Sequence, residues 1–422
     1  MDDRATTPRH WTASLRDGGW LDAKRVRAYA IMFLIAYAAM LVPPFIDATR
    51  GPGSDFLAFW GAARLTVAGT PQLVYDLAAE TAAQATTGIG NMIAYVNPPP
   101  FLLVIAPLGL LPYAVAWVVW SLTGWAVWLL VARRILPQAT LAIAAFPGAY
   151  LAASHAQNGF LTGALLIGGV LTLRRSQALS GALFGALIVK PHLALLVPLW
   201  LLAGRKWSAL AAGAASALGL SLLSVAAFGP ATWRAWPSSF AVSAAIMRNG
   251  DAVFWQRMST VYSAVRLHGG GTAAILAQSA VTLGCAALVV LVWRRTRDPE
   301  AAGALMLAAT ALGSPYLFAY DLAFLALPVF WLVREALARG FRPWERLALV
   351  ALYAAPLAAR ATALPLGTNL TPLAAAALVA LVWTRLNPSN AARQVHTASG
   401  GRLIRIASML PPVLRPNSVP RS

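Results

Sequence analysis

Long apolar runs limit most strongly how this chain of 422 residues can fold. A helix that crosses the hydrocarbon core of a membrane needs roughly 20 predominantly apolar residues. Four runs of about that length contain no charged side chain, and they cover residues 28–46, 113–132, 208–228 and 272–293. Because backbone in lipid must satisfy its hydrogen bonds internally, these runs predict membrane-spanning helices and an all-α polytopic membrane protein.

Eight shorter apolar stretches raise the predicted number of spans to about twelve. They cover residues 139–153, 160–173, 178–189, 192–203, 301–314, 321–333, 345–359 and 372–386. Short spans are tolerated where a helix borders a cavity or a thinned bilayer. A further proline-bounded stretch, 101–111, is too short to cross, so we expect it to be re-entrant or to lie at the interface.

The charged residues are few and strongly biased in sign. They make up 11% of the chain, against about 25% in a soluble domain, which excludes a soluble enzyme. With twelve alternating spans, every basic cluster falls on one side, and the positive-inside rule makes that side the cytoplasm. The net charge of +19 is therefore interpreted as a topology signal, and no nucleic-acid partner is expected.

This topology divides the chain into three parts, with both termini in the cytoplasm of a multi-pass membrane protein. Residues 1–27 form a cytoplasmic N-terminal segment, residues 28–386 the membrane domain, and residues 387–422 a flexible basic tail that touches anionic membrane lipids. Two external loops, about 47–100 and 229–271, are the longest and are rich in aromatic residues. We expect them to be ordered and to carry the function on the outer face.

Polar clusters interrupt the apolar pattern on the outer side, where ionisable groups are functional candidates by default. Asp55 follows the first span, and partial desolvation suits its carboxylate to act as a general base, although it also fits a helix N-cap. Asn97 precedes three prolines and fits either a sugar contact or the start of a helix. Gln157 and Asn158 suit sugar hydroxyls, but they also belong to a polar turn before a glycine.

Two further clusters and several isolated cations complete the outer side. Lys190 and His192 lie at a break between two short runs, where the lysine either pairs with a phosphate or extends to the membrane surface. Tyr320 and Asp321 open an apolar run, so they fit a sugar site, an interfacial aromatic residue or an N-cap. The other external cations, which the sequence does not sort, are Arg50, Arg64, Arg234, Arg248, Arg257, Arg266, His268 and Arg360.

Several common catalytic motifs are absent from the sequence. It contains no GxxxxGK[ST] phosphate loop, no HExxH and no GxSxG. The five histidines lie far apart and Cys285 is the single cysteine, so neither a metal site nor a cofactor is predicted. No two halves of the chain match, which argues against an inverted-repeat transporter.

Five motifs in order along the chain resemble glycosyltransferase family 87, a family of polytopic mannosyltransferases with the GT-C fold. The motifs are Ser54-Asp55-Phe56 followed by Gly69-Thr70-Pro71-Gln72-Leu73-Val74-Tyr75-Asp76, then Asn97-Pro98-Pro99-Pro100-Phe101, Gln157-Asn158-Gly159, Lys190-Pro191-His192, and Ser314-Pro315-Tyr316 with Tyr320-Asp321. The sequence departs from the family at Ala156, where a glycine is common. That departure concerns the geometry of the turn before Gln157.

The resemblance implies a GT-C membrane domain with about twelve helices and a reaction on the outer face. A sugar, expected to be mannose, would move from a polyprenyl-phosphate donor to a glycolipid or cell-envelope glycan. Asp55 would take the proton of the acceptor hydroxyl in a single inverting displacement. The resemblance further assigns the donor phosphate to Lys190, His192 and Arg64, and the sugar or acceptor to Asn97, Gln157, Asn158, Tyr320 and Asp321.

Two other classes of protein share the apolar composition. A transporter or flippase of lipid-linked sugars would also contain buried polar groups, but it needs them along a path between both faces. Here the polar clusters gather on one side, which favours chemistry at the outer surface. A purely structural assembly subunit leaves the clusters around Asp55 and Lys190 unexplained.

Overall fold

The computed structural model describes residues 8–386, and helices dominate this part of the chain. Within it no β-strand is present, and residues Met258 and Phe318 form one isolated antiparallel bridge. The all-α prediction is therefore confirmed for the described residues. The predicted flexible tail, 387–422, lies outside them.

The α-helices are α1 (Pro8–Asp17), α2 (Ala23–Met40), α3 (Val42–Arg50), α4 (Phe56–Val67), α5 (Leu77–Ala85), α6 (Leu102–Ile105), α7 (Tyr113–Ala132), α8 (Thr140–Ala144), α9 (Pro147–Ser154), α10 (Gly159–Thr172), α11 (Gln177–Gly185), α12 (Val197–Ala203), α13 (Trp207–Ala235), α14 (Ser238–Asn249), α15 (Ala252–Arg257), α16 (Val261–His268), α17 (Gly271–Leu291), α18 (Pro299–Gly313), α19 (Ala326–Arg339), α20 (Glu345–Leu366) and α21 (Thr371–Arg385). The 3-10 helices are η1 (Pro71–Tyr75), η2 (Pro99–Phe101), η3 (Ala106–Leu110), η4 (Pro137–Ala139), η5 (Ala186–Val189), η6 (Pro191–Ala194), η7 (Val292–Arg294) and η8 (Ala319–Leu325).

Five helical stretches between residues 8 and 386 are long and apolar enough to cross a membrane. They are Ala23–Arg50, Tyr113–Ala132, Trp207–Ala235, Gly271–Arg294 and Glu345–Leu366. Their outward side chains are apolar and well exposed, among them Leu218 and Leu283 at 61% and 71%. Lipid tails cover such side chains in a membrane, so the chain is a membrane protein. The predicted count of twelve spans and the GT-C fold are not confirmed.

The other predicted spans form helices shorter than these five, and several of them are interrupted. The stretch 139–153 is divided by a break at Ala145 and Phe146, before Pro147. The stretch 178–189 tightens from α11 into η5, and Pro191 begins η6 directly after Lys190. Pro147 and Pro191 lie in the first turns of α9 and η6, where the missing backbone N–H of proline costs no helical hydrogen bond, so these positions suit the start of a new segment.

The most deeply buried layer of the protein is α18 together with η8 and α19. Every residue of α18 except Glu300 and Leu312 is buried. Its alanines and its two glycines let α10, α17 and α21 approach closely. This layer carries η8, and therefore Tyr320 and Asp321, on a well-packed support.

Short helices occupy both predicted external loops. In the first, α4 packs with its aromatic face on the 99–110 segment, where the Phe59 and Phe101 ring centroids lie 5.0 Å apart. A Cβ atom at Gly109 would lie 2.5 Å from the Ala63 carbonyl oxygen, so only glycine permits this contact. In the second loop, α13 bends at Gly229 (φ 76°) before Pro230, at the boundary predicted for the end of that span.

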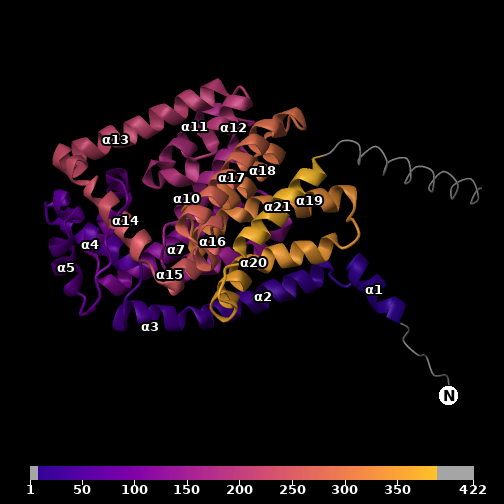
Figure 1. The fold of residues 1–422 in the computed structure, drawn as a ribbon, viewed down its shortest axis with the longest axis horizontal. Helices are drawn as coiled ribbons and strands as arrows, with labels where there is room; N and C mark the ends of the chain where they lie inside the picture. Colours follow the sequence, from indigo (N-terminus) through magenta and orange to yellow (C-terminus); the bar gives the residue numbers. More distant parts are fainter. Residues whose placement is uncertain (1–7, 387–422) are drawn as a thin grey trace, which may run out of the picture.

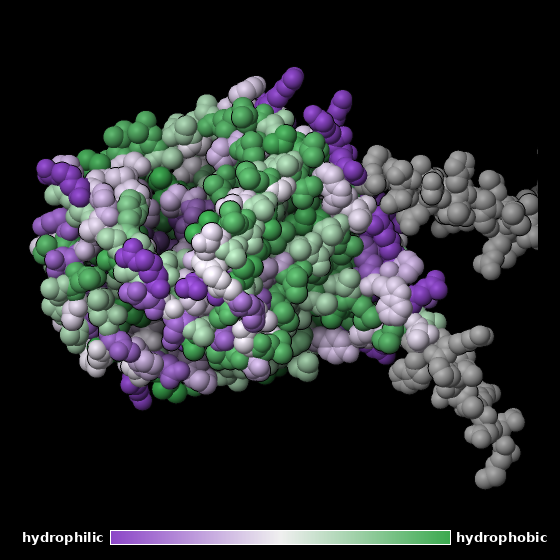
Figure 2. All heavy atoms as spheres, in the orientation of Figure 1, coloured by the Kyte–Doolittle hydropathy of each residue, from purple (hydrophilic) through white to green (hydrophobic). Residues whose placement is uncertain are grey.

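Figure 1 shows the arrangement of these parts along the long axis of the molecule. Helices α4 and α5 lie at the left end, whereas α1 and the end of α21 lie at the right end. On the face drawn in Figure 2, hydrophobic residues form a broad area, and strongly hydrophilic residues are concentrated toward the two ends. The predicted N-terminal segment is docked rather than free, because Trp344 N donates to Arg16 O at 2.7 Å.

Candidate active site

Asp55 occupies the N-cap position of α4, yet its side chain makes no capping hydrogen bond. Its Oδ2 atom instead accepts a hydrogen bond from Nε2 of Gln157 at 3.1 Å. The side chain is half-buried, between the predicted first external loop, 47–100, and the turn that connects α9 to α10. The N-cap interpretation of Asp55 therefore does not account for its carboxylate, which is directed at a second predicted site residue.

The turn that holds Gln157 and Asn158 is fixed by its backbone. Gln157 N donates to Ala152 O at 3.2 Å, and Ala156 adopts a left-handed conformation with φ 45°. A Cβ atom at Gly159 would lie 2.0 Å from the carbonyl oxygen of Tyr320. Glycine is required here because the start of α10 touches the backbone of η8. This contact brings two of the predicted motifs together.

Lys190 is buried and bonds inward, which excludes the interpretation that it extends to the membrane surface. Its Nζ atom lies 2.5 Å from Asp321 Oδ1 and donates to Asn158 Oδ1 at 2.9 Å. The exposed fractions of the two charged side chains are 8% and 0%. Asp321 Oδ2 also accepts from Phe318 N at 3.2 Å, so Asp321 serves both the ion pair and the start of η8.

Tyr320 connects the Lys190 pair to Asp55. Its ring centroid lies 5.3 Å from Lys190 Nζ and 5.5 Å from the ring of His155. Its hydroxyl is within hydrogen-bonding reach of the Asp55 carboxylate. We define the Asp55 cluster as the set of side chains joined by these contacts: Asp55, Gln157, Asn158, Lys190, Tyr320 and Asp321.

The structure places the other predicted site residues beside this cluster or away from it. Asn97 is adjacent, since its Nδ2 atom donates to Val189 O at 3.3 Å. His192 packs edge-on against Tyr316, with ring centroids 5.3 Å apart, and its buried Nε2 atom has no hydrogen-bond partner among the described residues. Arg64 instead donates to Gly109 O at 3.0 Å and lies over Trp60, so no recorded contact links it to the cluster.

Three residues near the cluster were not singled out from the sequence. His155 precedes the Gln157 turn; burial lowers its pKa, the negative charge of Asp55 opposes that shift, and the positive charges of Arg360 and Arg257 reinforce it. Both arginines therefore act electrostatically on His155, as Asp55 does with the opposite sign. They were present in the sequence only as unsorted external cations, because 103 residues separate them and no motif connects them.

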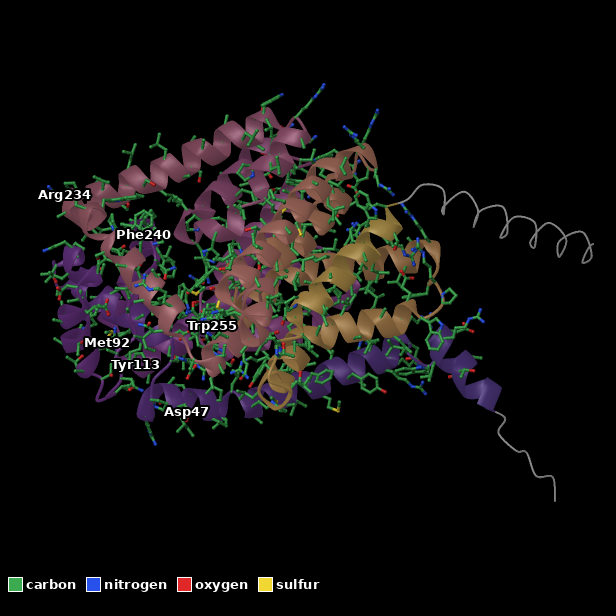
Figure 3. The ribbon with its side chains drawn as sticks, in the orientation of Figure 1. Asp47, Met92, Tyr113, Arg234, Phe240 and Trp255 are labelled. Carbon is green, nitrogen blue, oxygen red and sulfur yellow. The ribbon has the colours of Figure 1, made fainter. Side chains whose placement is uncertain are left out.

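The helices that carry the two arginines, α15 and α20, are in contact, and hydrogen bonds beside α15 connect the 229–271 loop to the last helices. Asn369, between α20 and α21, donates from Nδ2 to the carbonyls of Gln256 and Met258 at 2.8 and 2.9 Å. Ser259 N in turn donates to Leu317 O at 2.7 Å, two residues after Arg257. Figure 3 shows Trp255 of α15 in the same half of the molecule as Tyr113, whose ring stacks on Phe56 beside Asp55.

The charged groups of the cluster differ in whether they have an ion-pair partner. Between residues 8 and 386, no three side chains of His, Cys, Asp or Glu are grouped so that they hold a metal ion. Lys190 and Asp321 compensate each other, whereas Asp55, Arg257 and Arg360 form no ion pair there. Within residues 8–386, the carboxylate of Asp55 is therefore the charged group of the cluster that has no ion-pair partner.

Comparison with known proteins identifies the family of the chain. The family model described as glycosyltransferase family 87 matches residues 95–315, which is more than half of the chain. The chain belongs to glycosyltransferase family 87. No curated protein and no solved structure matches it. The protein is therefore a glycosyltransferase, and its long apolar helices show that it is a membrane protein.

The family match and the structure complement each other at the cluster. Gln157, Asn158 and Lys190 lie inside the matched stretch, whereas Asp55 and Asp321 lie outside it. The hydrogen bond from Gln157 and the ion pair with Lys190 connect those two carboxylates to the part of the chain that defines the family.

Proposed function

We propose that this glycosyltransferase moves a sugar, mannose in the first instance, from a polyprenyl-phosphate donor to a glycolipid or cell-envelope glycan. The reaction takes place on the outer face of the cell membrane, with both termini of the chain in the cytoplasm. Asp55 takes the proton of the acceptor hydroxyl while its oxygen attacks the anomeric carbon. Polyprenyl phosphate leaves from the opposite face of the sugar, which inverts the configuration.

The observation that carries this proposal is the environment of Asp55. Its carboxylate is half-buried, unpaired with any cation among the described residues, and oriented by Gln157. A general base needs a fixed position and a free lone pair, and both are compatible with a single donated hydrogen bond on Oδ2. Tyr320 and His155 border the same carboxylate and restrict how an acceptor reaches it.

The departing phosphate needs positive charge, because negative charge develops on its oxygen as the glycosidic bond breaks. Lys190, His192 and Arg64 are the cations predicted for this role from the sequence. In the structure the charge of Lys190 is compensated by Asp321, which suits it to orient Asn158 and Asp321. We propose Arg257 and Arg360 as additional phosphate ligands, since their charges act on the site without a carboxylate partner.

The hydroxyl groups of the sugar need neutral donors and acceptors. Asn158 is suited to this role because its Nδ2 atom is buried without a hydrogen-bond partner in the described part of the chain. Asn97, Gln157, Tyr320 and Asp321 complete the proposed sugar and acceptor contacts. The bilayer holds the polyprenyl tail of the donor, so no soluble partner or cofactor enters the proposed reaction.

The test is sugar transfer by the purified full chain, supplied with labelled polyprenyl-phosphate mannose and a membrane lipid extract. Asp55→Asn should reduce the rate of sugar transfer by about 10²- to 10⁴-fold, the usual contribution of a general base. The melting temperature should not change. Asp47→Asn is the matched control, because Asp47 is an exposed aspartate at the start of the same external loop. Full activity of Asp55→Asn would overturn the base assignment.

The same preparation distinguishes the competing class. A transporter or flippase of lipid-linked sugars would move the labelled donor across reconstituted vesicles without joining the sugar to an acceptor. Transfer that requires Asp55 supports the glycosyltransferase reaction with this donor. If movement without transfer is observed for every lipid extract and donor sugar tested, the proposed reaction is wrong.

A further inference from the structure

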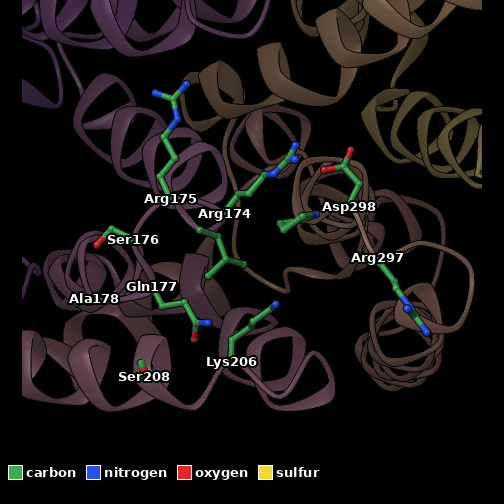
Figure 4. A pocket seen from close by; sticks show the side chains of 11 residues that line it. Arg174, Arg175, Ser176, Gln177, Ala178, Lys206, Ser208, Arg297 and Asp298 are labelled. Atoms are coloured by element: carbon green, nitrogen blue, oxygen red, sulfur yellow. The ribbon is translucent and has the colours of Figure 1, made fainter.

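A basic cavity lies where the loops after α10, α12 and η7 meet, and the reaction at Asp55 does not use it. Its volume is about 770 Å³. Four cations and one carboxylate line it: Arg174, Arg175, Lys206, Arg297 and Asp298. Figure 4 shows Arg174 and Lys206 extending into the space between the loops, whereas Arg175 and Arg297 extend outward from its rim. In the described part of the chain no carboxylate forms an ion pair with any of these four.

Backbone geometry adds to the positive potential of this cavity. Helices α11, α13 and α18 all begin there, since Gln177, Ser208 and Pro299 belong to their first turns and line it. The N-terminus of a helix carries partial positive charge and free N–H groups. Lys206, the N-cap residue of α13, gives that helix no side-chain cap. Ser176 and Asp298 already cap α11 and α18, so the anion is favoured by the cations of the three loops and by the uncapped start of α13.

The cavity lies at the opposite end of the helices from the Asp55 cluster. Helix α10 has Asn158 as its N-cap residue and Leu173, a lining residue of the cavity, as its C-cap residue. Its 14 residues span about 21 Å. The α11–η5 segment connects the same two places, from Ser176 to the residue before Lys190. The cavity is therefore a separate site and not an extension of the cluster.

Exposed apolar side chains close in sequence to the lining residues indicate whether the anion is a lipid headgroup or a free phosphate. Leu179, Leu202 and Trp207 are exposed at 50%, 47% and 60%, and each is adjacent or close in sequence to a lining residue. A free phosphate makes no use of such a border, whereas acyl chains cover it, and tryptophan favours the level of the headgroups. We propose that the cavity binds the phosphate-bearing headgroup of an anionic membrane lipid, with its acyl chains along these three side chains.

The test is lipid binding by the purified full chain in neutral detergent, followed by native mass spectrometry. Phosphatidylglycerol is titrated against phosphatidylcholine with the same acyl chains, and the dissociation constant of the first bound lipid is measured. The wild type should bind phosphatidylglycerol more tightly. Because one basic residue near a lipid surface contributes roughly fivefold in affinity, Arg174→Gln with Lys206→Gln should weaken this binding by about 25-fold.

The matched control removes two charges from the same end of the bundle outside the cavity. Arg133 and Arg134 are exposed, follow α7 directly and do not line the cavity, so Arg133→Gln with Arg134→Gln should change the affinity by less than about threefold. Equal losses in both double variants would show a diffuse surface charge and overturn the proposal. So would equal affinity of the wild type for the two lipids.

A third variant tests the sign of the effect and does not depend on removing a cation. Asp298 is the one acid of the cavity and caps α18 by accepting a hydrogen bond from Glu300 N, a role that asparagine also fulfils. Asp298→Asn should therefore tighten phosphatidylglycerol binding by about fivefold. The last measurement adds inorganic phosphate at the same concentration as the bound lipid. If phosphate displaces the lipid, the site binds a soluble anion and the lipid assignment is wrong.

Discussion

The two ends of α10, α11 and α18 hold their charges in opposite ways. At the Asp55 end, Lys190 and Asp321 are almost completely buried and compensate each other. At the other end, Arg174, Arg175 and Arg297 are exposed and have no carboxylate partner among the described residues. Buried charges depend on specific partners, whereas exposed charges depend on water and lipid. Substitutions at the first end should therefore change stability, and substitutions at the second end should change binding.

The largest effect on stability is expected from breaking the buried ion pair. Lys190→Met leaves the Asp321 carboxylate in the interior without its cation, which should lower the free energy of unfolding by about 3–5 kcal/mol. Unfolding of the purified protein by denaturant in detergent measures the change. Adding Asp321→Asn should recover most of the loss, because asparagine still accepts the hydrogen bond from Phe318 N. If the double variant is no more stable than Lys190→Met, packing rather than charge explains the loss.

Glu80 tests the same rule at a buried carboxyl without a cation. Glu80 lies on α5, in the predicted first external loop, with 0% exposure. It accepts a hydrogen bond from Gln84, and its Oε1 atom has no partner in the described part of the chain. Burial raises the pKa of Glu80 from 4.5 to about 8, and the hydrogen bond from Gln84 only partly opposes this. The folded protein therefore holds this proton more tightly than the unfolded chain does.

The sign of the pH dependence follows from that raised pKa. The folded state is not penalised below pH 4.5, and its stability falls as the pH rises from about 4.5 to about 8. Glu80→Gln should remove this dependence and stabilise the protein at pH 9 by up to about 4–5 kcal/mol. Melting temperatures at pH 5, 7 and 9 measure it. The same pH dependence in wild type and variant would contradict the assignment to Glu80.

A smaller effect is expected at the turn before Gln157. Ala156 adopts φ 45°, a conformation that costs a residue with a Cβ about 1–2 kcal/mol. Ala156→Gly relieves this strain but adds freedom to the unfolded chain and removes a buried methyl group. The net result should be a stabilisation of up to about 1 kcal/mol, measured by denaturant unfolding. Clear destabilisation would mean that the methyl group matters more than the backbone conformation.

The smallest effect is expected at the basic end. Arg174→Gln with Arg175→Gln removes two exposed cations that form no ion pair within residues 8–386, so the free energy of unfolding in neutral detergent should stay within about 0.5 kcal/mol of wild type. The comparison with Lys190→Met is made in the same detergent and at the same pH. A loss as large as that of Lys190→Met would remove the distinction between the two ends.

The apolar composition of the chain made both the helices and the members of the Asp55 cluster predictable from the sequence. Charged and amide side chains are scarce in a chain this apolar, so Asp55, Gln157, Lys190 and Asp321 stand out among their neighbours. Their pairing was not accessible, because 102 residues separate Asp55 from Gln157 and 131 separate Lys190 from Asp321. Only the fold shows that Lys190 forms an ion pair with Asp321.

Other features could not be read from local patterns. Hydropathy marks apolar segments but does not say whether a short one crosses the membrane, which is why the count of twelve spans stays a prediction beside five long helices. Arg257 and Arg360 resemble ordinary solvated cations, and their position near His155 depends on the hydrogen bonds that Asn369 makes to a loop more than 100 residues away.

The close backbone approach between Gly159 and Tyr320 fixes the position of two motifs independently of the side chains that face the substrate. It sets the spacing of two motifs through main-chain atoms, so the identity of the side chains around Asp55 is free to vary without moving the frame that presents them. A search for relatives or engineered variants with a different donor sugar is therefore best directed at positions 97, 157 and 158. Position 159 is closed to such diversification, since any larger residue would push the two motifs apart.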